Sequence, residues 1–287
     1  MKMILQTYSL SRVLQLIPPG TRGKARLARR LLGTAQNTKN VTVTDRFGNT
    51  FLVPSLRDPI AFYLVIDGMY EPWTTRFLLQ SLKKGQVFVD VGANIGAFAI
   101  LAAQHVGDAG KVLAIEASAQ IWPYLEYNMQ INQAKNLQVE HYALLDSDGL
   151  TLPFYNAPAE HFGMGSLAPQ FNELGQTVTT RCLDNVLESV HINRVDVLKV
   201  DVEGFEMLVF RGGEKLLTSQ ASPLIIFEFC DWAEERSSVA SVGDAQRLLY
   251  SWGYQIWRLQ DFICERSPLS TILTTGSEML VARKMYS

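Results

Sequence analysis

A buried strand that turns directly into a helix constrains this chain more than any other feature. Residues 87–91 are apolar and mostly β-branched apart from Asp90, and residues 97–104 are good helix formers. Between them, Gly92 and Gly96 allow a sharp turn or a close approach of a ligand to the backbone. Asp90 stands near the carboxyl end of the strand, at the edge where open α/β sheets bind their ligands.

Two kinds of cofactor use such a turn, and the residues distinguish them. A dinucleotide site has the pattern G-x-G-x-x-G, but Asn94 and Ala97 occupy its second and third glycine positions here. The carboxylate of Asp90 would also repel a pyrophosphate. A cofactor with a cationic centre, an ammonium group and no phosphate fits an acidic strand end better, which favours S-adenosylmethionine. The pattern D-x-G-x-N-x-G resembles the first motif of the class I S-adenosylmethionine-dependent methyltransferases.

The next predicted strand supplies a second acidic residue. Residues 111–115 are mostly apolar and end at Glu116, twenty residues after Gly96. At this distance an acidic side chain in a nucleotide-binding βαβ unit reaches the ribose hydroxyls. The alternative is a surface carboxylate at a strand end. Because Glu116 ends the neighbouring strand, we expect it to bind the ribose.

The rest of the chain alternates between predicted strands and helices. The pattern predicts an α/β fold: a Rossmann-like, doubly wound, mostly parallel sheet with a terminal antiparallel hairpin. The expected strands are residues 137–145, 195–202, 224–229, 254–259 and 278–283, and the expected helices are residues 121–133, 183–190, 205–217 and 244–252. An inserted hairpin and loop at about residues 150–181 has a length that is usually functional inside a compact domain.

Residues 1–84 form a predicted lead-in to the domain at residues 85–287, and they are a candidate lid. The first forty residues carry eight Lys or Arg and no acid, although the whole chain has a net charge of -2. A predicted helix at residues 22–32 places Leu27, Leu31 and Leu32 on one face, which suits peripheral contact with an anionic membrane. The alternative is a solvated basic face on a packing helix. A hairpin at residues 41–53 and a helix at residues 74–82, capped by Thr74 or Thr75, follow.

Several segments together resemble the FkbM family of methyltransferases. The strand and turn at residues 195–206 match that family's pattern L-K-h-D-h-E-G-x-E, in which h is apolar. The other matching segments are L-D-N-V-L (183–187), G-S-L (165–167), R-G-G (211–213) and D-G-M-Y-E-P (67–72). Tyr142 departs from the family, which often has Asn before the residue equivalent to Ala143.

The resemblance implies a Rossmann-like fold and methyl transfer from S-adenosylmethionine, commonly to a hydroxyl of a sugar, a lipid-linked glycan or a polyketide. The expected acceptor is therefore a small molecule or a glycan. The residues that we assign to the cofactor are Tyr70, Asp90, Gly92, Asn94, Gly96, Glu116 and Ala143.

Transfer to an alcohol requires alignment of the reactants and removal of a proton. Lys199, Asp201 and Glu203 place three ionisable groups within five residues of a buried strand and its turn, and His161 lies in the insertion. These four are the candidate catalytic residues. Lys199 is equally well explained by an internal ion pair with Asp201 or Glu203. Asp201 is a candidate general base, or a ligand for Mg²⁺ together with Glu203 or Glu228.

Composition excludes several classes of protein. With 47% hydrophobic and 19% charged residues the chain is typical of globular proteins. No apolar run approaches the roughly 20 residues of a membrane span, and the N-terminus is a poor secretory signal, so we expect a cytoplasmic protein. The basic charge is confined to one end, so we do not expect a nucleic acid partner. A nicotinamide oxidoreductase and a non-catalytic docking module are the alternative functions, and the oligomeric state is open.

Overall fold

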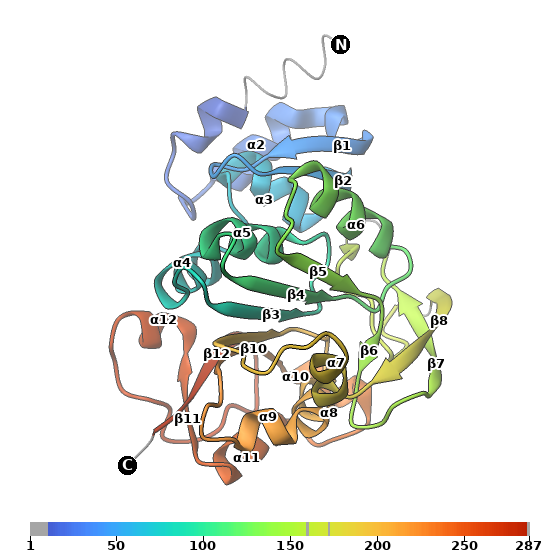
Figure 1. Cartoon of the computed structure of the whole chain (residues 1–287). Coiled ribbons are helices and arrows are strands. Elements are labelled where there is room, and N and C mark those ends of the chain that lie inside the picture. The colour runs from blue at the N-terminus through green and yellow to red at the C-terminus, as the bar shows by residue number, and fades with distance from the viewer. Residues whose placement is uncertain (1–10, 159–160, 172, 286–287) are drawn as a thin grey trace.

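A seven-stranded sheet forms the centre of the computed structural model, which describes residues 11–158, 161–171 and 173–285 (Figure 1). The strand order is β11-β12-β10-β9-β3-β4-β5. Strands β10, β9, β3, β4 and β5 are parallel, and β12 is antiparallel to both β10 and β11. The predicted doubly wound sheet with an antiparallel hairpin is confirmed. The strands are β3 (Val87–Val91), β4 (Lys111–Ile115), β5 (Leu137–Glu140), β9 (Val197–Val200), β10 (Leu224–Cys230), β11 (Tyr254–Arg258) and β12 (Ser277–Lys284).

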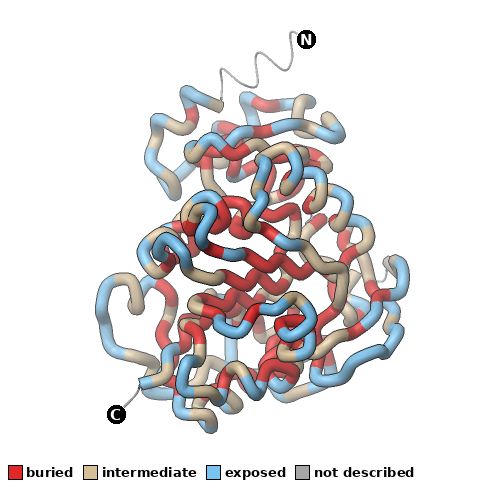
Figure 2. Tube along the Cα trace, viewed as in Figure 1, coloured by how far each residue is buried: buried red, intermediate tan, exposed pale blue. Residues whose placement is uncertain are grey.

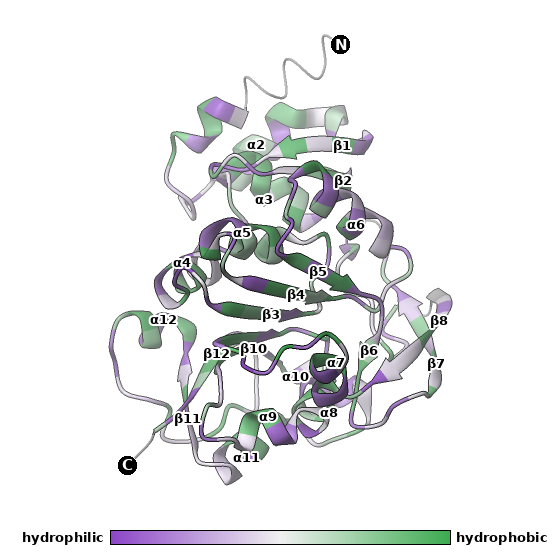
Figure 3. Cartoon of the chain, viewed as in Figure 1, coloured by the Kyte–Doolittle hydropathy of each residue, from purple (hydrophilic) through white to green (hydrophobic). Residues whose placement is uncertain are grey.

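The central strands are buried because helices cover both faces of the sheet (Figure 2). Parallel strands of this kind are apolar along their whole length rather than on alternate residues. All four residues of β9 are buried, and hydrophobic colour runs along the central strands in Figure 3. Lys199 on β9 and Asp90 on β3 are charged exceptions.

Two sets of helices build two hydrophobic cores, one on each face of the sheet (Figure 1). Side chains such as Phe62, Phe77 and Phe98 fill the first core, and Met207, Phe210 and Leu249 help to fill the second. The first set is α3 (Pro59–Asp67), α4 (Pro72–Ser81), α5 (Ala97–Val106) and α6 (Trp122–Ile131). The second set is α7 (Leu183–Ser189), α8 (Glu206–Gly212), α9 (Glu214–Thr218) and α11 (Asp244–Ser251).

The N-terminal segment packs on α6. After a helical turn at residues 11–15 come α2 (Lys24–Leu32), the 3₁₀ helix η1 (Gly33–Asn37) and a hairpin of β1 (Lys39–Thr44) and β2 (Thr50–Ser55). Asn128 of α6 and Asn132, which caps its C-terminus, accept hydrogen bonds from the backbone N–H groups of Leu52 and Thr50, at 2.7 and 2.8 Å. These asparagines satisfy backbone groups of β2 that would otherwise lack partners.

The three leucines predicted on one face of the first basic helix are divided between two environments, because Leu32 is buried and Leu27 and Leu31 are not. The buried residues of α2 are Lys24, Ala28 and Leu32, whereas Leu27 and Leu31 are 48% and 53% exposed. The helix turns a different face toward the core because Lys24 is neutralised there by Asp67, at 2.6 Å. The rest of the predicted apolar face therefore lies on the surface.

The insertion forms a small sheet of its own, with strand order β6-β8-β7. Strands β7 (Thr151–Asn156) and β8 (Glu173–Arg181) confirm the predicted hairpin, and β6 (Ala143–Leu144) pairs with β8. The single strand expected at residues 137–145 is therefore wrong. The ladder with β4 ends at Glu140, and the chain then crosses to pair with the insertion.

Two other predicted helices differ in detail. The helix expected at residues 205–217 is split into α8 and α9 at Gly213, which caps both, because two consecutive glycines weaken a helix. Gly212 ends α8 in a close contact, since a Cβ there would lie 2.1 Å from the carbonyl oxygen of Leu145. The predicted cap of α4 is wrong, since Glu71 is the N-cap and Pro72 occupies the first turn. The short helices α10 (Asp231–Ser237) and α12 (Leu259–Ile263) were not predicted.

Within the described ranges, no helix has the length and apolar character needed to cross a membrane.

Candidate active site

The turn after β3 forms one wall of the site because its glycines permit close packing. Gly92 has a φ of +76°, and a Cβ there would lie 1.8 Å from the backbone carbonyl oxygen of Asp201. The β3 turn and the end of β9 therefore touch. Gly96 has a φ of +86° and caps α5, where a Cβ would lie 2.8 Å from Leu125. Its role is to let α5 begin close to α6.

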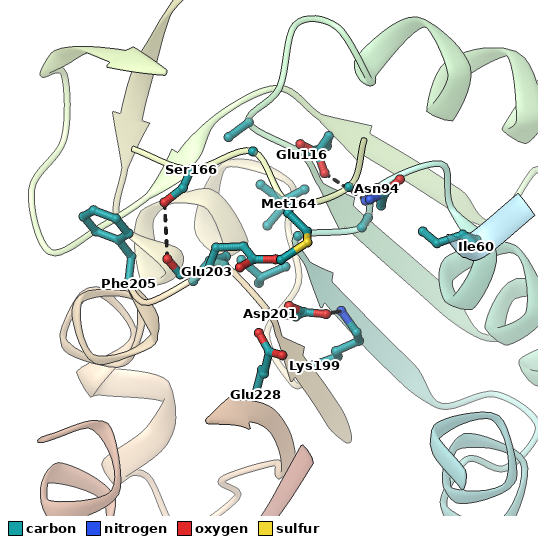
Figure 4. Close-up of a pocket in the computed structure, with 18 of the residues that line it drawn as sticks. Ile60, Asn94, Glu116, Met164, Ser166, Lys199, Asp201, Glu203, Phe205 and Glu228 are labelled. Carbon is teal, nitrogen blue, oxygen red and sulfur yellow. Dashed lines mark hydrogen bonds and ion pairs between the residues drawn. The ribbon is translucent and has the colours of Figure 1, made fainter. Parts of the chain in front are cut away.

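A cavity opens at the carboxyl ends of β3, β4, β9 and β10 (Figure 4), as expected for this fold. Most of the residues assigned from the sequence line it. They are Tyr70, Gly92, Asn94, Glu116, Ala143, His161, Lys199, Asp201, Glu203 and Glu228. Asp90 and Gly96 are not among the lining residues. Both lie behind the wall, so their predicted contact with the cofactor is not seen in the geometry.

Glu116 marks one end of the cavity, next to Asn94 (Figure 4). Its carboxylate accepts the backbone N–H of Asn94 at 2.8 Å through Oε2 and that of Ser118 at 2.7 Å through Oε1. Burial raises the pKa of Glu116, although these two hydrogen bonds oppose the rise. Each oxygen keeps a lone pair, so the side chain is held rigidly and can still accept a hydrogen bond from a ligand.

Lys199 lies between two carboxylates. Its Nζ is 3.1 Å from Oδ2 of Asp201 and 3.4 Å from Oδ1 of Asp90. Burial lowers the pKa of Lys199, but the carboxylates of Asp201 and Asp90 outweigh it and the pKa rises above its ordinary value. Burial raises the pKa of Asp90 to about 6, with Lys199 opposing the shift. Lys199 thus forms the ion pair expected with Asp201, and Asp90 rather than Glu203 is its second partner.

Three carboxylates gather at the other end of the cavity, where β9 and β10 finish (Figure 4). One ligand atom from each of Asp201, Glu203 and Glu228 lies within 4.8 Å of the others. Burial, followed by the charges of Asp201 and Glu206, raises the pKa of Glu203 to about 8. Burial and the charge of Asp201 also raise the pKa of Glu228 well above its ordinary value. This end of the cavity therefore favours a cation or a proton.

The insertion covers the cavity. Ser166 Oγ and Gln170 Nε2 donate to the backbone carbonyl of Glu203, at 3.2 and 3.1 Å. A Cβ on Gly163 would lie 2.3 Å from Asn94 Nδ2, so the insertion also rests on the β3 turn. His161 lines the cavity and stacks on Phe171, with ring centroids 5.7 Å apart.

Sequence reasoning missed several lining residues. Glu71 is a half-buried carboxylate that accepts a hydrogen bond from Thr74 Oγ1 at 2.8 Å, and desolvation followed by the charge of Asp201 raises its pKa. It lies in the D-G-M-Y-E-P segment, which is the one signal in the sequence that could have identified it. Phe98, Met164 and Phe205 are apolar lining residues with no distinguishing pattern in the sequence.

Comparisons with known proteins agree with the geometry. The family model described as the Methyltransferase FkbM domain matches residues 90–256, which confirms the expected family. The chain is 28% identical over 144 residues to the hexuronic acid methyltransferase AglP of Haloferax volcanii, covering 50% of this chain and 56% of that protein. It is 27% identical over 190 residues to Methyltransferase 1 of Beauveria bassiana, covering 58% of this chain and 72% of that protein. A solved FkbM methyltransferase from Methylobacillus flagellatus aligns with 98% of this chain and 60% of its own, at 13% identity and a TM-score of 0.47.

Proposed function

Because the chain belongs to the FkbM methyltransferase family, we propose that it transfers the methyl group of S-adenosylmethionine to a hydroxyl oxygen of an acceptor. One observation carries the proposal. A single cavity contains both Glu116, which is placed like the carboxylates that bind ribose hydroxyls, and the three carboxylates Asp201, Glu203 and Glu228. The first end would hold the nucleoside, and the second end would hold the reacting oxygen.

The charge of the cavity supports a cationic donor. Its lining includes six carboxylates and one lysine, Lys199, whose charge is shared between Asp90 and Asp201. The carboxylates are Asp58, Glu71, Glu116, Asp201, Glu203 and Glu228. A sulfonium and an ammonium group would be attracted to this lining, whereas the pyrophosphate of a nicotinamide cofactor would be repelled. The oxidoreductase alternative is therefore disfavoured.

We assign the proton transfer to Asp201. In the reaction, the acceptor oxygen forms a bond to the methyl carbon, the carbon–sulfur bond breaks, and its electron pair remains on sulfur. The hydroxyl proton passes to a carboxylate. Asp201 lines the cavity with a side chain that is 28% exposed, and Lys199 fixes its Oδ2 at 3.1 Å. Its Oδ1 is left to accept a hydrogen bond from the acceptor, which is the geometry of a positioned general base.

A second mechanism is favoured by the separation of the three carboxylates. Oxygen ligands around a hard cation lie at about 2.0–2.6 Å from it, so ligand atoms within 4.8 Å of one another fit a shared ion such as Mg²⁺. Asp201, Glu203 and Glu228 would hold the ion, and it would polarise the acceptor hydroxyl. Titration with Mn²⁺ and assays in EDTA separate the two mechanisms. A metal mechanism predicts binding of Mn²⁺ and loss of turnover in EDTA, whereas a base mechanism needs no metal ion and predicts full turnover in EDTA.

For the acceptor we propose a hydroxyl on a sugar or on a sugar-containing molecule. The relative from Haloferax volcanii is named a hexuronic acid methyltransferase, and its match covers half of this chain. The cavity supports a polar acceptor, because carboxylates rather than an apolar surface surround the end where β9 and β10 finish.

Calorimetric titration with S-adenosylhomocysteine tests the function. We expect binding by the wild type and a loss of about tenfold in affinity for Glu116→Gln, since one charge-assisted hydrogen bond is removed. Glu140→Gln is the matched control, because Glu140 ends the adjacent strand β5 and is not among the lining residues. An absence of heat with the wild type at millimolar ligand would overturn the proposal. Binding without methyl transfer to any sugar acceptor would instead support a non-catalytic module.

A further inference from the structure

The outer face of α2 combines two features that rarely occur together on a free surface. Leu27 and Leu31 are 48% and 53% exposed, and Arg26 and Arg30 beside them are also exposed. Positions 26, 27, 30 and 31 are neighbours on one side of a helix. Lys24, Ala28 and Leu32 occupy the opposite, buried side. The exposed face therefore carries a ridge of arginines next to a ridge of leucines.

The body of the protein holds this helix firmly. Lys24 donates to Asp67 and to the carbonyl of Ile17, both at 2.6 Å. The guanidinium of Arg29 lies over the ring of Phe62, 4.3 Å from its centroid. Since these contacts fix the rotation of α2, the two leucines cannot turn inward without breaking a buried ion pair.

Among the residues that the structure describes, the arginines of the exposed face have no polar partners. Neither Arg26 nor Arg30 has a hydrogen bond or an ion pair with any of the described residues. No acidic residue occurs in the first forty positions of the chain. The face is thus positive and partly apolar, and it lies in the part of the molecule remote from the central sheet (Figure 1).

We propose that this face of α2 docks on an anionic lipid bilayer. Arginine side chains can reach lipid phosphates while the adjacent leucines enter the boundary of the acyl chains. A bilayer therefore offers ion pairs to the arginines and an apolar environment to the leucines at the same time. A nucleic acid would leave the leucines without a role. With only two leucines the apolar contact is small, so binding depends on anionic headgroups and weakens with salt.

Co-sedimentation of the full chain with vesicles tests the proposal. We expect binding to vesicles that contain phosphatidylglycerol and little binding to pure phosphatidylcholine. Leu27→Ser/Leu31→Ser and Arg26→Glu/Arg30→Glu should each weaken binding by about tenfold or more. Leu150→Ser is the apolar control, because Leu150 is 47% exposed and lies outside α2. Lys83→Glu/Lys135→Glu is the charge control, because both lysines are exposed elsewhere.

Two outcomes would overturn the proposal. One is an absence of binding to anionic vesicles, or binding that the two α2 variants leave unchanged. The other is self-association in analytical ultracentrifugation that Leu27→Ser/Leu31→Ser abolishes, since a second copy of the chain would then cover the face. Because α2 contributes no residue to the cavity, titration with S-adenosylhomocysteine verifies that the variants are folded.

Discussion

Two glycines show how differently the same backbone conformation can be used. Gly92 and Gly149 have φ values of +76° and +78°, but a Cβ on Gly92 would overlap the carbonyl of Asp201 and one on Gly149 would meet nothing within 4 Å. We expect Gly149→Ala to lower the free energy of unfolding by about 1 kcal/mol. Gly92→Ala should lower it by several times as much, because the wall of the cavity must move. Urea unfolding measures both, and equal losses would contradict the crowding at Gly92.

Asp201 is the residue whose substitution separates chemistry from binding. We expect Asp201→Asn to lower kcat by about 10²–10⁴, the usual contribution of a general base. Its affinity for S-adenosylhomocysteine should change little, since the proposed nucleoside contacts lie at Glu116. Single-turnover kinetics and calorimetry measure the two effects, and a rate close to that of the wild type would exclude Asp201 as the base.

The sequence identified most residues of the candidate site because the ends of parallel strands meet at one edge of the sheet. Glu116, Asp201 and Glu228 were found in this way. The contact between Lys199 and Asp90 could not be read from the sequence, because it depends on the register that places Asp90 opposite Lys199 in adjacent strands. Glu71 was missed as a lining residue because it precedes a helix far from any strand end.

At the scale of single elements, α2 shows why hydrophobic pattern alone is an incomplete guide. The sequence predicted a face of leucines with the basic residues around it, but Lys24 is 4% exposed and pairs with Asp67 of α3. A buried ion pair overrides the pattern when both charges are satisfied. Apart from β5, which was predicted too long, the strands of the central sheet were predicted well because their apolar runs are short and bounded by turns or acidic residues.

The Lys24 ion pair leads to a prediction about stability. We expect Lys24→Met to lower the free energy of unfolding by about 3–5 kcal/mol, because it leaves the carboxylate of Asp67 buried without a partner. Lys24→Met/Asp67→Leu should restore most of this loss, since neither charge then remains. Denaturant titration of the two variants checks it, and a double variant as unstable as the single one would argue against the buried charge as the cause.

For the molecule as a whole, buried acids make stability depend on pH in an unusual direction. Burial raises the pKa of Glu206 to about 8 and of Asp58 to about 6, above their unfolded values of 4.5 and 3.8. At a pH between the unfolded and the folded pKa of each group, the folded state therefore binds more protons than the unfolded state. The stability that these two groups contribute is fully present below about pH 4 and is lost as the pH rises toward 8, by about 1.4 kcal/mol per pH unit for each proton involved.

Glu206→Gln tests this pH dependence, because the amide oxygen can still accept the N–H groups of Val202 and Gly204 that now bond to Oε1. We expect a flatter plot of unfolding free energy against pH between about 5 and 8. The ligand-free wild type measured in parallel is the control. A slope that is unchanged by the substitution would mean that Glu206 is ionised in the folded protein at neutral pH.

Strand β12 lies in the interior of the sheet, between β10 and β11, although it follows both of them along the chain. During synthesis on the ribosome, the sheet therefore cannot close until residue 284 has left the exit tunnel. Until then, one backbone edge of β10 is unpaired, and this strand carries the apolar side chains of Ile225, Ile226 and Phe227. Such an edge is prone to aggregate and is a surface that chaperones recognise. A nonsense mutation before β12 would thus yield an insoluble product rather than a shortened enzyme.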